Sequence, residues 1–168
     1  TLLFMKTLIV MRHATSPNIA DRDIDRSLNA EGMQEVEQIA QSLKNYTINK
    51  VLCSSSLRTV ETYNIIKEHI KVNLVDITPE LYNVSEVELL EHIMQQRNFI
   101  ECLLLIGHNP ALSNLITLLT ENHKAHKYEF LGVLSPAEAV VLTFVSDKWS
   151  DISSSDIKIE KIFKPIKM

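Results

Sequence analysis

Glycine is scarce in this chain of 168 residues, which contains only Gly32, Gly107 and Gly132. None of the three forms a G-x-G-x-x-G loop, which excludes a doubly wound nucleotide-binding domain. A run of about 20 apolar residues is also missing, so no segment is expected to span a membrane. Basic residues number 17 against 21 acidic ones, with a net charge of -4. This balance argues against nucleic acid as a partner, because backbone binding depends on clustered Lys and Arg.

Cysteine is equally rare, and both residues, Cys53 and Cys102, lie inside apolar runs. Their spacing fits neither a disulfide framework nor a metal site, so we predict two buried, reduced thiols. The apolar opening of the chain is broken by Lys6 and lacks the cleavage site of a secretory signal. We therefore expect a cytoplasmic protein, in which Met5 is the natural start and residues 1–4 are an added remnant.

Strand and helix patterns alternate along most of the chain. Short apolar runs predict strands at 7–11, 51–53, 72–77 and 102–106. Helical spacing and capping residues predict helices from Asn29 to 43, from 57 to about 69, from 86 to about 96, and from Asn109-Pro110 with Pro at the first helical position. Two tail strands, 139–145 and 157–163, are expected to form an antiparallel pair. This order predicts a single α/β domain over 1–168, a three-layer αβα sandwich with a mainly parallel six-stranded sheet and helices on both faces.

Polar residues of one chemical kind follow three of the predicted parallel strands. Arg12 and His13 end the first strand, Arg58 lies one turn into the helix after the second, and His108 follows the fourth. Taken singly, each is more typical of a solvated charge or a structural histidine. Ligands of such sheets bind at the carboxyl ends of the strands, where helix N-termini already favour anions. The presence of two Arg and two His residues at this one edge indicates a pocket for a phosphoryl group.

The run Leu8–Ala14, with Arg12-His13 directly after the first strand, resembles the signature of the histidine phosphatase superfamily, which includes cofactor-dependent phosphoglycerate mutases. Segments 27–32, 54–62 and 107–110 resemble the other motifs of that superfamily and occur in its order. The resemblance covers about Lys6 to Leu119 and is strongest to the short branch of SixA-like phosphohistidine phosphatases. It implies a phosphoglycerate mutase-like fold.

The resemblance also implies roles for individual residues. His13 would be the nucleophile that forms a phosphohistidine, and Arg12, Arg58 and His108 would bind the phosphoryl oxygens. His13 would have to be neutral and His108 protonated, so their pKa values should be pushed apart, with a carbonyl or carboxylate orienting His13. No metal or other cofactor is needed, because the guanidinium groups supply the charge. Ser16 and Asn18 match, or nearly match, substrate-binding positions of larger relatives.

Two departures from the family pattern bear on the substrate. Ala14 replaces the usual Gly, which is acceptable unless the position needs a positive φ. Larger members carry a Glu as general acid where this chain has Asn83, with Glu80 as a nearby reserve candidate. Without an acid, an alkoxide leaves poorly, whereas the imidazole of a phosphohistidine leaves readily. The short loop 15–27 also provides little material for a closing lid. Both features favour a phosphatase acting on phosphohistidine in proteins over a mutase.

Two other functions stay open. The first is a small-molecule phosphomonoesterase of the same family, using Glu80 or water as the acid. The second is a phosphate-binding module without catalysis, although His13, Arg12, Arg58 and His108 are all present. The partner would be a phosphorylated protein or a small phosphorylated substrate, and the oligomeric state is open. His123 and His126, at helical spacing, are interpreted as surface residues rather than a metal site.

Overall fold

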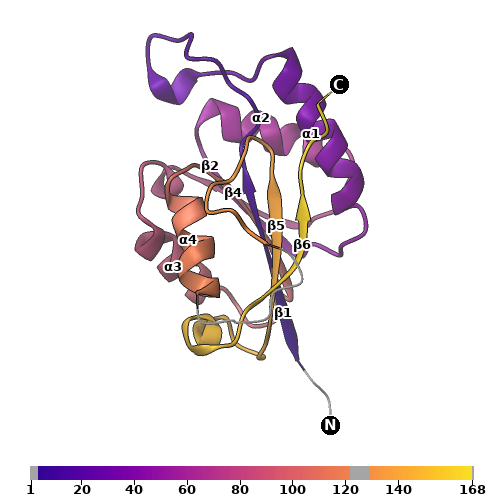
Figure 1. The fold of residues 1–168 in the computed structure, drawn as a ribbon, viewed down its shortest axis with the longest axis vertical. Coiled ribbons are helices and arrows are strands. Elements are labelled where there is room, and N and C mark those ends of the chain that lie inside the picture. Colours follow the sequence, from indigo (N-terminus) through magenta and orange to yellow (C-terminus); the bar gives the residue numbers. More distant parts are fainter. Residues whose placement is uncertain (1–3, 122–128, 168) are drawn as a thin grey trace.

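The computed structural model describes residues 4–121 and 129–167, which form one six-stranded sheet flanked by helices (Figure 1). The strand order is β3-β2-β4-β1-β5-β6. The strands are β1 Met5–Arg12, β2 Lys50–Ser54, β3 Leu74–Thr78, β4 Cys102–Gly107, β5 Ala139–Val145 and β6 Lys158–Phe163. Parallel pairs join β1 to β4, β4 to β2 and β2 to β3, whereas β5 pairs antiparallel with both β1 and β6. The predicted fold class and the antiparallel tail pair are confirmed.

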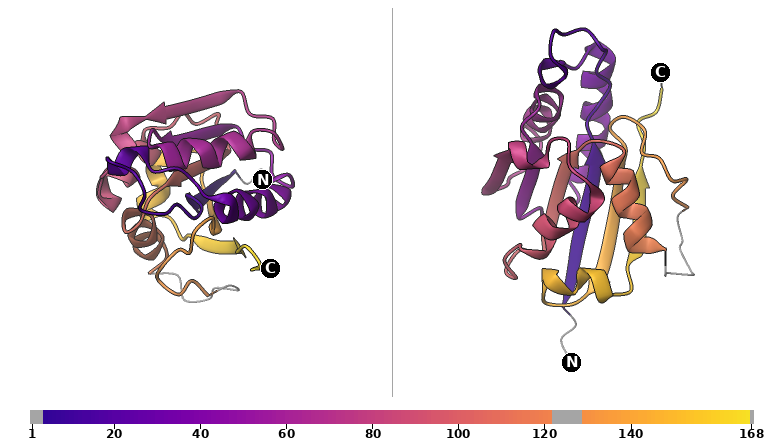
Figure 2. Two further views of the ribbon diagram at one scale, coloured as in Figure 1. Left: turned by 90° about the horizontal axis from the view of Figure 1, so that it is seen from above. Right: turned by 90° about the vertical axis from the view of Figure 1, so that its left-hand side faces the viewer.

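Helices cover both faces of the sheet. On one face lie α1 (Ala30–Leu43) and α2 (Leu57–Ile66), and on the other lie α3 (Glu86–Met94), α4 (Ala111–Thr120) and the 3-10 helix η3 (Trp149–Ser154) (Figure 2). Alternate residues of β1 pack against the helices on opposite faces of the sheet, because successive side chains on a strand point to opposite faces. Leu8 and Val10 pack with α3 and α4, while Ile9 and Met11 pack with α1 and α2.

The central strands are apolar throughout because both of their faces are covered. All six residues of β4 are buried, whereas β3, at the edge of the sheet, is mostly exposed. The strand predicted at 72–77 spans Leu74–Thr78 in the structure, where each of its residues pairs with a residue of β2. Cys53 and Cys102 are free and buried, as predicted, and burial raises the pKa of each thiol to about 12.

Local capping explains where three of the helices begin. The Asn29 side chain accepts a hydrogen bond from the Gly32 N–H at α1, and Ser56 accepts one from the Thr59 N–H at α2. Ser85 and Glu88 form the predicted capping box at α3. The prediction that Pro110 is the first helical residue is wrong by one position. The Pro110 carbonyl accepts the first intrahelical bond, from Asn114, so Pro110 caps a helix that starts at Ala111.

Some expectations from the sequence fall on other parts of the chain. Residues 1–3 of the expected remnant, and both His123 and His126, lie outside the described residues. Within 4–121 and 129–167, no helix has the length and apolar character needed to cross a membrane.

Candidate active site

The strand order brings the predicted site residues to one edge of the sheet. β2, β4 and β1 are adjacent, so the residues after their carboxyl ends share that edge. The rings of His13 and His108 lie 5.4 Å apart between centroids. Arg58, which is 6% exposed, lies in the first turn of α2, and its Nε is 3.3 Å from His13 Nε2. Three segments that are distant in sequence therefore meet around a buried imidazole.

Hydrogen bonds fix the orientation of His13. Its backbone is held on both sides, by N–H donation to the Gly107 carbonyl and by acceptance from the Ala137 N–H. The ring Nδ1 lies 2.8 Å from the Ala14 carbonyl. A carbonyl oxygen only accepts, so Nδ1 carries the hydrogen and the lone pair lies on Nε2, where Arg58 donates to it. The orienting group expected from the sequence is thus the Ala14 carbonyl.

The substitution of Ala14 for glycine does not disturb the backbone. In the described ranges, the residues other than glycine with positive φ are Asn83 and Ala137, so position 14 does not need a glycine. The buried Ala14 donates its N–H to Thr62 Oγ1 at 3.2 Å. The glycine that the site does require is Gly32, on α1. A Cβ there would lie 2.3 Å from the Thr15 carbonyl oxygen, so the absence of a side chain lets the strand-end loop pack directly on the helix.

His108 faces His13 from the end of β4. Its Nε2 lies 2.9 Å from Ser54 Oγ, and its ring meets the ring of Tyr82 edge-on at 5.5 Å between centroids. A Ser54 hydroxyl that donates to Nε2 leaves the ring hydrogen on Nδ1, so even the neutral ring can donate from that atom. Ser54 is buried at the end of β2 and was not expected among the site residues.

The expected divergence of the two histidine pKa values is wrong. Burial, reinforced by neighbouring cations, lowers the pKa of His13 to about 3 and that of His108 to about 4. Desolvation disfavours the charged form of both rings, and Arg12 and Arg58 act on both in the same direction. Both imidazoles are therefore neutral at pH 7, which suits a nucleophile at His13. A dianion bound between them would raise both values.

Two buried donors in the site have no partner. Arg12 donates from Nη1 to the Leu134 carbonyl at 3.0 Å, but its Nε makes no hydrogen bond. His108 Nδ1 is also buried and makes no hydrogen bond. In the described part of the chain, the third buried side-chain polar atom without a partner is Gln96 Oε1. Burial of an unsatisfied donor costs about 1–3 kcal/mol. Such a cost is offset when an anion binds there.

A charged group that the sequence did not indicate lies against the cluster. Asp23, in the 3-10 helix η1 (Asp23–Asp25), accepts from Arg58 twice, at its carbonyl (2.8 Å) and at Oδ2 (3.0 Å). The Tyr82 hydroxyl donates to the same Oδ2, and Arg26 Nη1 donates to Oδ1 at 3.1 Å. Hydrogen bonds from Tyr82 and Arg26 hold the pKa of the Asp23 carboxyl well below its usual range. The sequence showed only a charged loop, because nothing local links Asp23 to Arg58.

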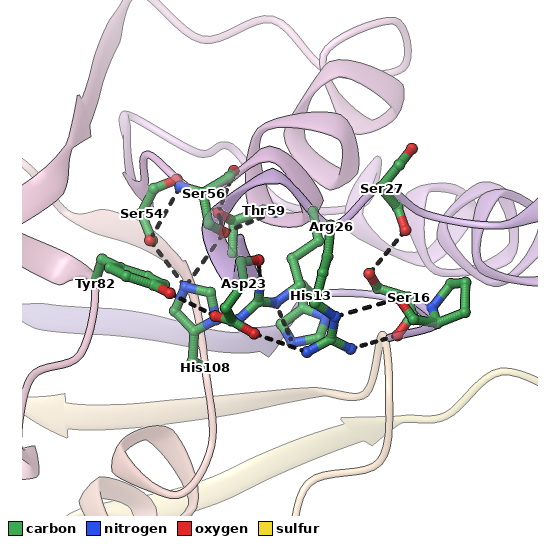
Figure 3. Close-up of polar contacts among 12 residues, drawn as sticks. His13, Ser16, Asp23, Arg26, Ser27, Ser54, Ser56, Thr59, Tyr82 and His108 are labelled. Carbon is green, nitrogen blue, oxygen red and sulfur yellow. Dashed lines mark hydrogen bonds and ion pairs between the residues drawn. The ribbon is translucent and has the colours of Figure 1, made fainter. Parts of the chain in front are cut away.

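The predicted substrate-binding residues, Ser16 and Asn18, lie on the same loop as Asp23. The Ser16 hydroxyl donates to the Ser27 carbonyl at 2.7 Å, and the Ser16 carbonyl accepts from Arg26 (Figure 3). Asn18 is exposed. These contacts tie the loop to itself rather than to the two histidines. A role for Ser16 and Asn18 in substrate binding stays a prediction.

The two candidates for a general acid, Glu80 and Asn83, have neighbours other than His13. Glu80, in the 3-10 helix η2 (Pro79–Leu81), lies 3.7 Å from His92 Nε2 and is largely exposed on the side of α3. Asn83 has a φ of 55° and lines a small cavity shared with His108 and Asn109. An amide cannot supply a proton at neutral pH. Neither residue therefore provides a carboxylic acid beside the nucleophile.

Comparison with known proteins agrees with this geometry. Residues 8–88 match the family model described as the histidine phosphatase superfamily (branch 1). The predicted family resemblance is confirmed. The matched segment includes Arg12, His13 and Arg58, whereas His108 lies beyond it. No curated protein sequence matches the chain.

Solved structures of several phosphatases share the fold. A candidate phosphohistidine phosphatase SixA from Nakamurella multipartitia is 24% identical, with a TM-score of 0.81 over 97% of this chain and 98% of its own. The protein histidine phosphatase SixA in complex with tungstate is 20% identical, with a TM-score of 0.77 over 95% and 97%. A mycobacterial glucosyl-3-phosphoglycerate phosphatase is 14% identical, with a TM-score of 0.64 over 93% and 97%. The fold is thus that of phosphatases with different substrates.

Proposed function

We propose that this protein is a metal-independent phosphatase that forms a phosphohistidine on His13, and that its substrate is phosphohistidine carried by another protein. The observation that carries the proposal is the shape of the donor set around His13 Nε2. A lone pair on that atom lies beside Arg58, and the unpaired buried donors belong to Arg12 and His108 at the same edge of the sheet. A tetrahedral oxyanion would satisfy these donors and bring phosphorus onto the nucleophile.

The first half-reaction follows from this arrangement. His13 Nε2 attacks phosphorus in line, the bond from phosphorus to the leaving group breaks, and Arg12, Arg58 and His108 hold the three equatorial oxygens. Arg58 Nε must leave His13 Nε2 for a phosphoryl oxygen, which frees the lone pair as the substrate binds. The Ala14 carbonyl keeps the hydrogen on Nδ1 throughout. In the second half-reaction water attacks the phosphohistidine, and His13 leaves as the same neutral imidazole, with inorganic phosphate as the product.

The surroundings of the leaving group support phosphohistidine as the substrate. Glu80 is paired with His92, and Asn83 is an amide, so an alkoxide would leave without a nearby carboxylic acid. Loss of a general acid costs about 10²–10⁴ in rate for a phosphoester. An imidazole that keeps its other ring hydrogen leaves as a neutral molecule and needs no acid. The SixA proteins of similar fold, described as phosphohistidine phosphatases, point to the same substrate.

Metal independence rests on the chemistry of the donor set. Two guanidinium groups supply the positive charge that a transferring phosphoryl group needs, and the neutral imidazole of His108 adds a hydrogen bond. Residues 4–121 and 129–167 contain no group of three or more His, Cys, Asp or Glu arranged to hold a metal ion. The single-domain organisation and the cytoplasmic location stay predictions.

The proposal is tested by trapping the intermediate. A substrate protein phosphorylated with ³²P on histidine is mixed with the enzyme, and the reaction is quenched in alkali after milliseconds to seconds, because phosphohistidine is labile in acid. We expect label on the wild-type chain and none on His13→Ala. The matched control is His69→Gln, a partly buried histidine paired with Glu37, which should label like the wild type. Turnover by His13→Ala at the wild-type rate would contradict the role of His13.

The substrate class requires a separate measurement. Values of kcat/KM for the phosphohistidine protein are compared with those for a panel of sugar and nucleotide phosphates. A preference for the phosphohistidine protein supports the proposal, and a clear preference for an alkyl phosphoester identifies a small-molecule phosphomonoesterase instead. Binding of phosphate without turnover of any substrate would indicate the non-catalytic module.

A further inference from the structure

A carboxylate at the mouth of a phosphate pocket is unexpected, because it repels the anion and competes for the arginine that should bind it. The Asp23 carboxylate nevertheless accepts a hydrogen bond from Arg58 at Oδ2, and the Asp23 backbone carbonyl accepts a second one. The Asp23 side chain is 51% exposed, whereas that of Arg58 is 7% exposed, so the carboxylate lies between the buried guanidinium and solvent. A substrate that reaches Arg58 from solvent would therefore pass close to Asp23. This placement suits a substrate that carries a positive group next to its phosphoryl group.

Phosphohistidine has that charge distribution. When the ring nitrogen that does not carry phosphorus is protonated, an N–H group of a cationic ring lies next to the phosphoryl dianion. That ring leaves as neutral imidazole, provided that the N–H stays in place during the transfer. A hydrogen-bond acceptor on the substrate side would hold it, and an anionic acceptor would favour the protonated ring.

The enzyme's own imidazole, that of His13, has its ring N–H held by a hydrogen-bond acceptor in the same manner. Phosphoryl transfer from one histidine to another is chemically symmetric, with an imidazole at each end of the reacting axis. On the enzyme side, the Ala14 carbonyl accepts the Nδ1 hydrogen of His13 at 2.8 Å. The substrate side needs an equivalent acceptor, and the Asp23 carboxylate contacts Arg58, one of the phosphate-binding residues.

Asp23 retains the capacity to make this bond. A carboxylate offers about four acceptor positions. Three are taken, by Arg58 and Tyr82 at Oδ2 and by Arg26 at Oδ1. The remaining position lies on Oδ1. The two arginines and Tyr82 also fix the carboxylate in one orientation, which reduces the entropic cost of binding a ring N–H.

We propose that the Asp23 carboxylate binds the ring N–H of the substrate phosphohistidine and so selects phosphoramidate over phosphoester substrates, an inference that rests on the proposed function. In the transfer, the bond between phosphorus and the substrate nitrogen breaks and the bond to His13 Nε2 forms. The electron pair of the broken bond returns to the substrate ring. The ring keeps its other hydrogen, held by Asp23, and departs as neutral imidazole.

The test compares two substrates in one variant. Asp23→Asn removes the charge and keeps the size of the side chain. Steady-state kcat/KM is measured for a peptide phosphorylated on histidine and for p-nitrophenyl phosphate, whose leaving group has no N–H. We expect the ratio of the two values to fall by about tenfold or more, because hydrogen bonds to charged groups are the strong ones. The matched control is Asp25→Asn on the same short helix, where the carboxylate pairs with Arg22 and the ratio should keep its wild-type value.

The possible outcomes distinguish a failure of the proposed role of Asp23 from a failure of the proposed phosphatase function. Equal losses on both substrates would show that Asp23 only positions Arg58, and would overturn the inference while leaving the phosphatase intact. A wild-type enzyme that hydrolyses p-nitrophenyl phosphate but not the phosphohistidine peptide would overturn both. Tyr82→Phe keeps the carboxylate and its charge, so its ratio should stay closer to the wild-type value than that of Asp23→Asn.

Discussion

Acidification should destabilise the folded protein through the two histidines of the site. In the unfolded chain a histidine has a pKa of about 6.5. In the folded protein burial lowers the pKa to about 3 for His13 and about 4 for His108. As the pH falls below 6.5, His13 and His108 bind protons in the unfolded chain but stay neutral in the folded protein. Stability is thus fully present above the unfolded pKa and is lost toward the folded values.

The size of the effect follows from proton counting. Between pH 4.5 and 5.5 each of these histidines is protonated in the unfolded chain and neutral in the folded one. A difference of one bound proton changes the free energy of unfolding by about 1.4 kcal/mol per pH unit. Carboxylates add to the total slope, so the informative quantity is the difference between variants.

Urea denaturation followed by circular dichroism measures this difference. The free energy of unfolding is determined at pH 4.5, 5.0, 5.5 and 7.0 for the wild type, His13→Gln and the double variant His13→Gln/His108→Gln. We expect the slope between pH 4.5 and 5.5 to decrease by about 1.4 kcal/mol per pH unit with each histidine removed. Equal slopes in the wild type and His13→Gln would show that His13 titrates normally, which would refute the argument for a neutral, buried nucleophile.

Two further substitutions probe the scaffold of the site. Gly32→Ala places a Cβ 2.3 Å from the Thr15 carbonyl, so the loop after His13 must move; we expect thermal denaturation to report a loss of about 1–3 kcal/mol, together with reduced turnover. Wild-type stability would show that the loop yields without cost. Ser54→Ala removes the hydroxyl 2.9 Å from His108 Nε2, and kcat/KM should fall by up to about tenfold, as expected for one neutral hydrogen bond. Ser55→Ala on the same turn is its control, and equal effects of the two would contradict a specific role for Ser54.

Much of the architecture could be predicted because it depends on short-range patterns. The buried central strands are continuous apolar runs, and the caps at Asn29 and Ser85 act within one helical turn. Boundaries were less predictable where neighbours decide them. The edge strand β3 takes its limits from its pairing with β2, and α4 begins one residue later than Pro110.

The sequence by itself determined the order of strands and helices, and with it the meeting of Arg12, His13, Arg58 and His108 at one sheet edge. This follows from general rules for parallel sheets, which need only the positions of the strand ends. The tertiary structure alone decided which nitrogen of His13 carries the lone pair, that both histidine pKa values are lowered, and that Asp23 contacts Arg58 and Tyr82 contacts His108. These properties depend on burial and on contacts between residues far apart in the sequence, which local patterns do not encode.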